Sequence, residues 1–140
     1  MRDERIEAIL GFDRVRKIIS DRCSTEYATT RTSEEEFSTN AKEIRRRLQL
    51  TDEMRLIVMF EESFPSNGYI DCVGFLEMLT NEGANIDLVS LGKLRTMLET
   101  LRKISIFFSN IKDGVYPYLK KMVSGIVLFP DVQHRIDTIL

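Results

Sequence analysis

The sequence is poor in the residues that make turns and cross-links. It has no Trp, three Pro and seven Gly among 140 residues, and its cysteines are Cys23 and Cys72. Scarce Gly and Pro favour long helices over a turn-rich β architecture. Two cysteines without CxxC spacing exclude a disulfide framework, so we expect a reducing, cytoplasmic environment. No apolar run approaches the roughly 20 residues of a membrane span, and the charged N-terminus does not resemble a signal peptide.

Charge and hydrophobicity are ordinary. The formal net charge is −2, with 30% charged and 43% hydrophobic residues. This balance gives no global attraction to nucleic acid, so a basic site would have to be a local patch. The length fits one domain, which we treat as residues 1–140, and it is long enough to bury a core.

The strongest pattern is an apolar stripe between Leu88 and Phe108, which predicts a long amphipathic helix. Its expected core residues follow a three-four spacing: Leu91, Leu94, Leu98, Leu101 and Phe108. Met97, Ile104 and Ile111 run beside them, and charged residues occupy the other faces. Such a helix needs other parts of the chain, or a partner, to cover it.

A second long helix is predicted from Asn40, as N-cap, to about Glu62, with Glu43 completing a capping box. Its expected buried side begins with Ile44, Leu48, Leu50, Met54 and Ile57. Residues 56–60 are apolar on every face, so we expect this end to be deeply buried.

Shorter helices are predicted at 2–10, 12–23 and 25–31, after Asp71 as far as Gly83, and from Pro117 and Pro130. In the second of these, Phe12, Val15, Ile18 and Ile19 should face inward and Arg14, Arg16, Lys17 and Arg22 outward. A polar linker is expected near 32–40. The fold class is therefore all-α, with antiparallel helices packed around two long central ones. Because the periodic pattern of the last helix is unfinished at Leu140, we expect the segment to belong to a longer protein.

The sequence offers little for catalysis. It has no GxxxxGK[ST] or GxGxxG loop, so no nucleotide site is predicted. His134 is the single histidine, and no spacing joins it to Cys23 or Cys72 as metal ligands or as a nucleophilic pair. Glu34, Glu35 and Glu36 are best explained as a solvated acidic linker. We therefore predict no catalytic, cofactor-binding or metal-binding residue within this segment.

Two basic groups could contact phosphates without reading sequence. One comprises Arg14, Lys17 and Arg22, and the other begins at Arg45 and continues through Arg46 and Arg47. An ordinary charged face is the simpler explanation, because Glu43, Asp52 and Glu53 lie nearby in the sequence. Tyr116 and Tyr118, before Lys120 and Lys121, could offer a stacking site for a single strand, although anchoring in a core or interface is the commoner role.

Several stretches, in order, resemble the second bacterial MutS lineage, the MutS paralogue with a C-terminal Smr nuclease domain. Residues 10–19, LGFDRVRKII, resemble its opening "LEFDKI…IL", and residues 23–26, CSTE, fall where it has "ASSELG". Residues 43–53 resemble its long "EI…L…T.EAL.L" helix. Residues 64–71, FPSNGYID, resemble its "FPLGGI.DI" loop, and residues 86–88 stand where it has "LSPEEL" before another long helix.

The resemblance implies a helical core, or lever, segment of a DNA-binding ATPase that acts on recombination or repair intermediates. Such proteins dimerise, bind branched or otherwise non-canonical DNA, and in some bacteria act on collided ribosomes. Their ATP and Mg²⁺ sites and their endonuclease residues lie in other domains, so the resemblance transfers none of them to these 140 residues. No membrane partner is expected. The alternative is a free-standing helical interaction module, with a partner groove near 56–60 and 104–108.

Overall fold

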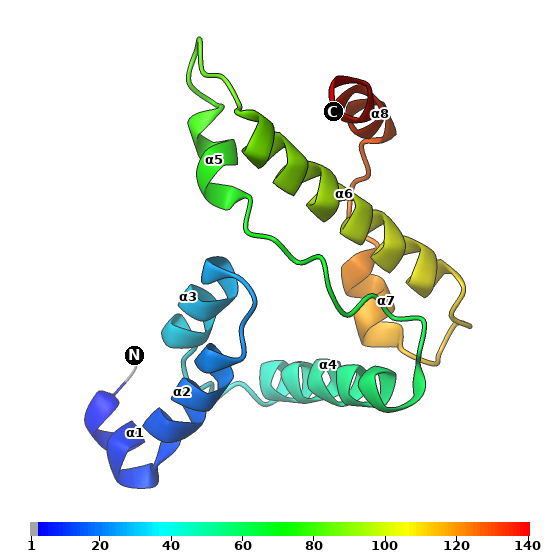
Figure 1. Cartoon of the computed structure of the whole chain (residues 1–140). Coiled ribbons are helices and arrows are strands. Elements are labelled where there is room, and N and C mark those ends of the chain that lie inside the picture. Colours follow the sequence, from blue (N-terminus) through cyan, green and yellow to red (C-terminus); the bar gives the residue numbers. More distant parts are fainter. Residues whose placement is uncertain (1–2) are drawn as a thin grey trace.

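The computed structural model describes residues 3–140, and this part of the chain contains eight helices and no strand. The all-α prediction is thus confirmed, as are two longer helices (Figure 1). Arg2, where the first helix was predicted to begin, lies outside the described residues. The helices are α1 (Glu4–Leu10), α2 (Phe12–Asp21), α3 (Glu26–Glu34), α4 (Ala41–Phe60), α5 (Val73–Met78), α6 (Leu88–Ser109), α7 (Pro117–Val123) and α8 (Pro130–Ile139).

The helices do not form one bundle. Helices α1, α2 and α3 pack in order as an N-terminal unit, α4 packs on α7, and α6 packs on both α7 and α8 (Figure 1). The predicted central pair is wrong, because α4 and α6 do not lie against each other along their lengths. The short helix α7 contacts both of them instead, so the long helices come together through one end of each.

That junction holds an aromatic core. Ile57 of α4 is fully buried among Phe107 and Phe108 of α6 and Tyr116, which precedes α7. Phe64 adds an edge-to-face contact with Phe107, with ring centroids 5.2 Å apart. Such pairs add about 0.5–1.5 kcal/mol beyond the area they bury. The three helices are therefore joined at one well-packed point.

The N-terminal unit is organised around a buried charge. Arg16 was predicted on the outer face of α2, but its side chain is 8% exposed and pairs with the 2% exposed side chain of Glu7 at 2.7 Å. The guanidinium also donates to the carbonyl oxygens of Thr32 and Glu35, and it lies over the Phe12 ring. A buried guanidinium needs such partners, because an unpaired buried charge is very costly. The prediction that Arg16 lies on the solvent-facing side of α2 is thus wrong.

Helix ends follow their local sequence closely. Asn40 and Asp87 cap α4 and α6 as predicted, each accepting a backbone N–H three residues later. Pro117 and Pro130 open α7 and α8 as predicted. Two expectations fail: the Glu43 carboxylate binds Arg46 and Arg47 rather than closing a capping box, and α5 ends at Met78, well before Gly83.

A long loop, residues 61–72, leads from the end of α4 to α5 and passes α6. The hydroxyl of the buried Thr100 donates to the carbonyl oxygen of Gly68 at 2.8 Å. Gly68 has φ +84°, and a Cβ there would lie 2.5 Å from Thr100 Oγ1. Glycine is required at this crossing for both reasons.

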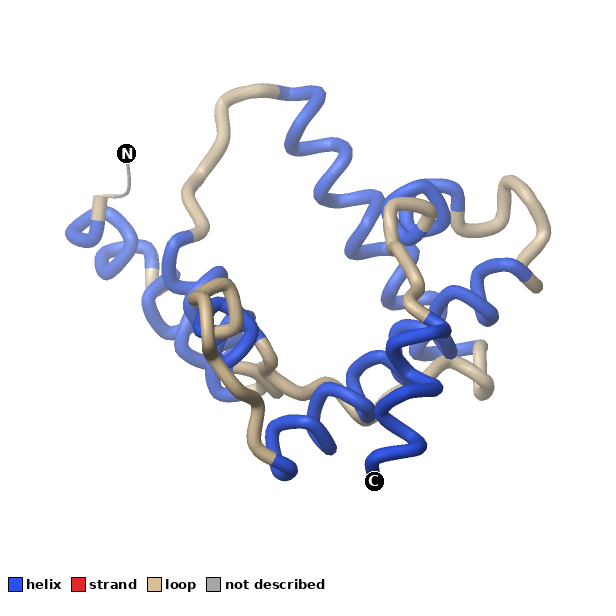
Figure 2. The backbone as a smooth tube through the Cα atoms, turned by 90° about the horizontal axis from the view of Figure 1, so that it is seen from above, coloured by secondary structure: helices blue, strands red, loops and turns tan. Residues whose placement is uncertain are grey.

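The helices are arranged openly (Figure 2). Many large apolar side chains are exposed. The C-terminal end of α4 was predicted to be deeply buried, but Val58, Met59 and Phe60 are 73%, 60% and 68% exposed. The following residues, predicted to face inward, are also exposed: Val15, Ile18, Ile19, Ile44 and Leu48. These predictions assumed that each apolar face had a neighbour within the chain.

Candidate binding cleft between α4 and α7

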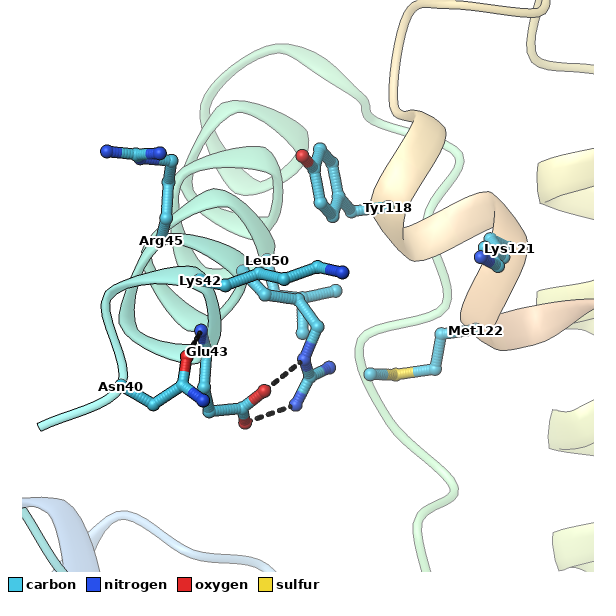
Figure 3. A pocket seen from close by; sticks show the side chains of 9 residues that line it. Asn40, Lys42, Glu43, Arg45, Leu50, Tyr118, Lys121 and Met122 are labelled. Carbon is cyan, nitrogen blue, oxygen red and sulfur yellow. Dashed lines mark hydrogen bonds and ion pairs between the residues drawn. The ribbon is translucent and has the colours of Figure 1, made fainter. Parts of the chain in front are cut away.

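A cleft of about 640 Å³ lies between the N-terminal half of α4 and the side of α7 (Figure 3). Its volume is in the range of small-molecule and cofactor sites. Two segments about 70 residues apart in the sequence form its walls. The lining residues are Asn40, Lys42, Glu43, Arg45, Arg46, Leu50, Tyr118, Lys121 and Met122.

A buried carboxylate holds the two walls together. Glu53 lies in the middle of α4 and is 5% exposed. Its two oxygens accept the backbone N–H groups of Tyr118 and Leu119, at 3.0 and 2.7 Å. These are among the first donors of α7, which have no partner within their own helix. A carboxylate from α4 therefore caps α7, and it places Tyr118 and the residues after it along the cleft.

The inside of the cleft is apolar. Leu50 forms its floor, and Tyr118 and Met122 reach from α7 towards α4 (Figure 3). The Tyr118 side chain is 42% exposed, so part of its ring is open to a ligand. Flat or apolar groups are the ones that such a wall can accept.

Basic groups surround this apolar centre. The Glu43 carboxylate pairs with Arg46 and Arg47, and their hydrogen bonds lower its pKa from 4.5 to about 2. Lys42, Arg45 and Lys121 have no ion-pair partner among residues 3–140. Figure 3 shows Lys42 extending across Leu50, whereas Arg45 points outward at the rim. The cleft thus carries uncompensated positive charge, and an anionic ligand fits it.

The structure brings together some of the predicted site residues and separates others. Arg45 lines the cleft, together with Tyr118 and Lys121 from the aromatic-basic pattern. Arg14, Lys17 and Arg22 belong to α2 or follow it and do not line the cleft, and Lys17 pairs with Asp21.

Two other members of the aromatic-basic pattern have different roles. Tyr116 is 5% exposed and donates to Glu61, and its pKa is raised by burial and by that carboxylate. Lys120 bonds Asp113 and the carbonyl oxygen of Ile111. Neither is therefore available as a stacking or phosphate-binding group.

The expected structural core is only partly covered. Leu91 and Phe108 are buried, and Leu94, Leu98 and Leu101 are half-buried. Sequence reasoning missed four cleft features, namely Glu53, Lys42, Leu50 and Met122. Glu53 was treated as a compensating surface acid, and nothing in the local sequence indicates that α7 lies opposite it.

No cluster of metal-ligating side chains is found in the described part of the chain. Within it, no three His, Cys, Asp or Glu side chains come together as metal ligands. His134 is exposed on α8, and Cys72 is buried, with its thiol pKa raised first by desolvation and then by Asp71. No helix among residues 3–140 is both long and apolar enough to cross a membrane.

Comparison with protein-family models, with curated proteins and with solved structures finds no match for this chain.

Proposed function

We propose that this chain is a non-catalytic helical core segment of a MutS-type DNA-binding ATPase in the cytoplasm. Its helices would transmit nucleotide-driven movement from an ATPase domain to a DNA clamp. The resemblance of residues 10–19, 43–53 and 64–71 motivates the family. ATP, Mg²⁺ and any endonuclease chemistry would belong to other domains of the parent protein, which would act as a homodimer on branched DNA or on ribosomes.

One observation supports a scaffold role above the others: the chain exposes too much surface for a compact monomer. Its accessible surface is 10,874 Å² for 16.3 kDa. Folded monomers of this mass expose roughly 7,500 Å². The excess of about 3,400 Å² is larger than the roughly 1,000–2,500 Å² that one partner contributes to an obligate interface. Much of it comes from large apolar side chains on α1, α2, α4 and α8.

The long helix α6 suits a lever. At 22 residues it is about 33 Å long. It is anchored at two places, because Phe107 and Phe108 near its C-terminal end lie in the aromatic core while Arg95 and Glu99 in its middle bind α8 through Asp137 and Gln133. Leu94, Leu98 and Leu101 of the same helix are half-buried. A further helix from the parent protein, packed on that face, would complete the lever.

The genomic reading frame tests the proposal directly. Continuation past Leu140 into a GxxxxGK[ST] motif would support it, whereas a stop codon directly after Leu140 would refute it. The proposal also expects no Mg²⁺-dependent ATP binding by residues 1–140 alone. Isothermal titration that showed such binding would contradict it.

Chemical labelling provides a second test, in the parent protein. Cysteines introduced by Ile9→Cys and Phe60→Cys should react with a maleimide in residues 1–140 and be protected in the parent protein. Lys103→Cys, on an exposed charged face of α6, is the matched control and should react in both. Equal reactivity of Phe60→Cys in both proteins would show that its face is not covered.

A free-standing helical interaction module remains the second candidate. The observation that favours it is the exposed end of α4, where Val58, Met59 and Phe60 follow the buried Ile57. The part of the predicted groove near 104–108 is wrong at Phe107 and Phe108, which are buried in the aromatic core. An amphipathic partner helix could cover this end. The two candidates differ in the reading frame, since only the scaffold requires an ATPase in the same chain.

A further inference from the structure

The cleft between α4 and α7 combines two features that are unconnected in the sequence. Arg45 and Lys42 come from the first two turns of α4, and Tyr118 and Lys121 come from α7. Three of these are cations without an ion-pair partner among residues 3–140, and the fourth is an aromatic ring that is 42% exposed. Lys42 extends across the cleft, whereas Arg45 points outward at its rim (Figure 3). Cations along a groove that holds an accessible ring are the arrangement that single-stranded nucleic acids bind, with phosphates on the cations and a base on the ring.

We propose that this cleft binds a short stretch of single-stranded nucleic acid, with one base against Tyr118 and the flanking phosphates near Lys42, Arg45 and Lys121. The proposal goes beyond the scaffold role and does not depend on the family, because both walls of the cleft lie within this chain.

The inner wall favours a base over a purely anionic ligand. Leu50 and Met122 add apolar and polarisable contact surface beside the tyrosine ring (Figure 3). A duplex presents its bases inside the helix, whereas a single strand can insert one into a cleft of about 640 Å³. An acidic peptide would use the cations but would leave this wall without a flat partner.

The pairing within the cleft limits the charge available to the ligand. Arg46 is bound to Glu43 by two hydrogen bonds of 2.9 and 2.8 Å. The remaining three cations would neutralise about three phosphates. The logarithm of the binding constant should therefore fall with the logarithm of the salt concentration with a slope near −2. Binding should fall about 20-fold between 50 and 200 mM salt.

The backbone of Tyr118 is held in place by a contact that does not involve its ring. The backbone N–H of Tyr118 donates to Glu53, so replacing the ring leaves the α7 cap intact. This allows the aromatic contribution to be tested without disturbing the wall that carries it.

The test is fluorescence anisotropy of the 140-residue chain with a fluorescein-labelled eight-residue oligothymidylate at 50 mM salt. We expect Tyr118→Phe to bind like the original protein and Tyr118→Leu to bind about fivefold or more weakly, as the loss of one stacked base requires. Lys42→Gln combined with Lys121→Gln should weaken binding and reduce the salt slope. Lys103→Gln combined with Lys112→Gln removes the same charge from exposed sites outside the cleft, and this control should bind nearly as well as the original.

Three results would overturn the proposal. The first is no binding at 50 mM salt by a chain with an unchanged circular dichroism spectrum. The second is equal weakening by the cleft pair and the control pair, which would indicate diffuse attraction. The third is equal competition by a polyglutamate peptide of the same charge, together with unchanged binding by Tyr118→Leu, which would assign the cleft to an acidic protein partner.

Discussion

Replacing Glu53 by Ala should destabilise the protein far more than replacing the neighbouring Asp52. Glu53 is 5% exposed and accepts two backbone N–H groups of α7. Asp52 is half exposed and bonds Arg55, one turn along the same helix. The two positions are adjacent and both are acidic, so their comparison isolates the effect of the cap.

The structure sets the size of the effect. Each buried N–H left without an acceptor costs about 1–3 kcal/mol, and the lost interaction of the carboxylate with the N-terminus of α7 adds about 0.5–2 kcal/mol. Relief of the cost of burying a charge offsets part of this sum. We expect Glu53→Ala to lower the free energy of unfolding by about 3 kcal/mol, and Glu53→Gln, which keeps one acceptor oxygen, by about half as much.

Urea unfolding, followed by circular dichroism at 222 nm, measures these differences. Asp52→Ala should change the unfolding free energy little, because exposed ion pairs contribute little. The cap would be refuted if Glu53→Ala and Asp52→Ala shifted the urea midpoint equally at the same slope. It would equally be refuted if Glu53→Gln were more damaging than Glu53→Ala.

Two further predictions concern the contacts of α6. Gly68→Ala should destabilise the protein, because φ is +84° and the added Cβ would meet Thr100 Oγ1. Gly92→Ala, in open space on α6, should be neutral or stabilising by up to about 1 kcal/mol. Thermal unfolding of both variants checks these opposite signs. The Glu99 carboxylate bonds Arg102 and, more weakly, Gln133 of α8, and these contacts lower its pKa from 4.5 to about 2. Its contribution to the free energy of unfolding is therefore complete above pH 4.5 and is lost as the pH falls towards 2. Glu99→Gln should reduce this acid dependence in urea titrations, and an unchanged dependence would contradict the contact.

Local signals predicted the helices well. Asn40, Asp87, Pro117 and Pro130 mark helix starts through interactions within one turn, and the structure has each of them. Such features depend on neighbouring residues alone, so they are readable without knowing the fold.

Burial was predicted less well, for a physical reason. Apolar periodicity identifies a face that needs cover, but it does not say whether the cover lies in the same chain. Phe60 and Leu48 remain 68% and 65% exposed because nothing within residues 3–140 covers them. Conversely, Arg16 and Glu53 are buried because partners in other helices satisfy their charges, and hydrophobic patterns place charged residues outside by default.

The sequence indicated some residues of the candidate cleft but not that they lie together. Arg45 and Tyr118 were each noticed for their chemistry, but their association requires the packing of α7 on α4. Lys42 and Met122 carry no local signal of a site. Glu53 contributes to the α4–α7 contact, and its role could be recognised only with α7 in place.

The cap that Glu53 supplies also has a consequence for how the chain folds. Helix α7 has seven residues, and so short a helix does not persist on its own in water. The backbone N–H groups of Tyr118 and Leu119, in its first turn, donate to Glu53, more than 60 residues earlier in the sequence. We therefore predict that α7 becomes ordered only once it packs on α4. Fragments that end before residue 117 lack α7 and so lack the second wall of the cleft.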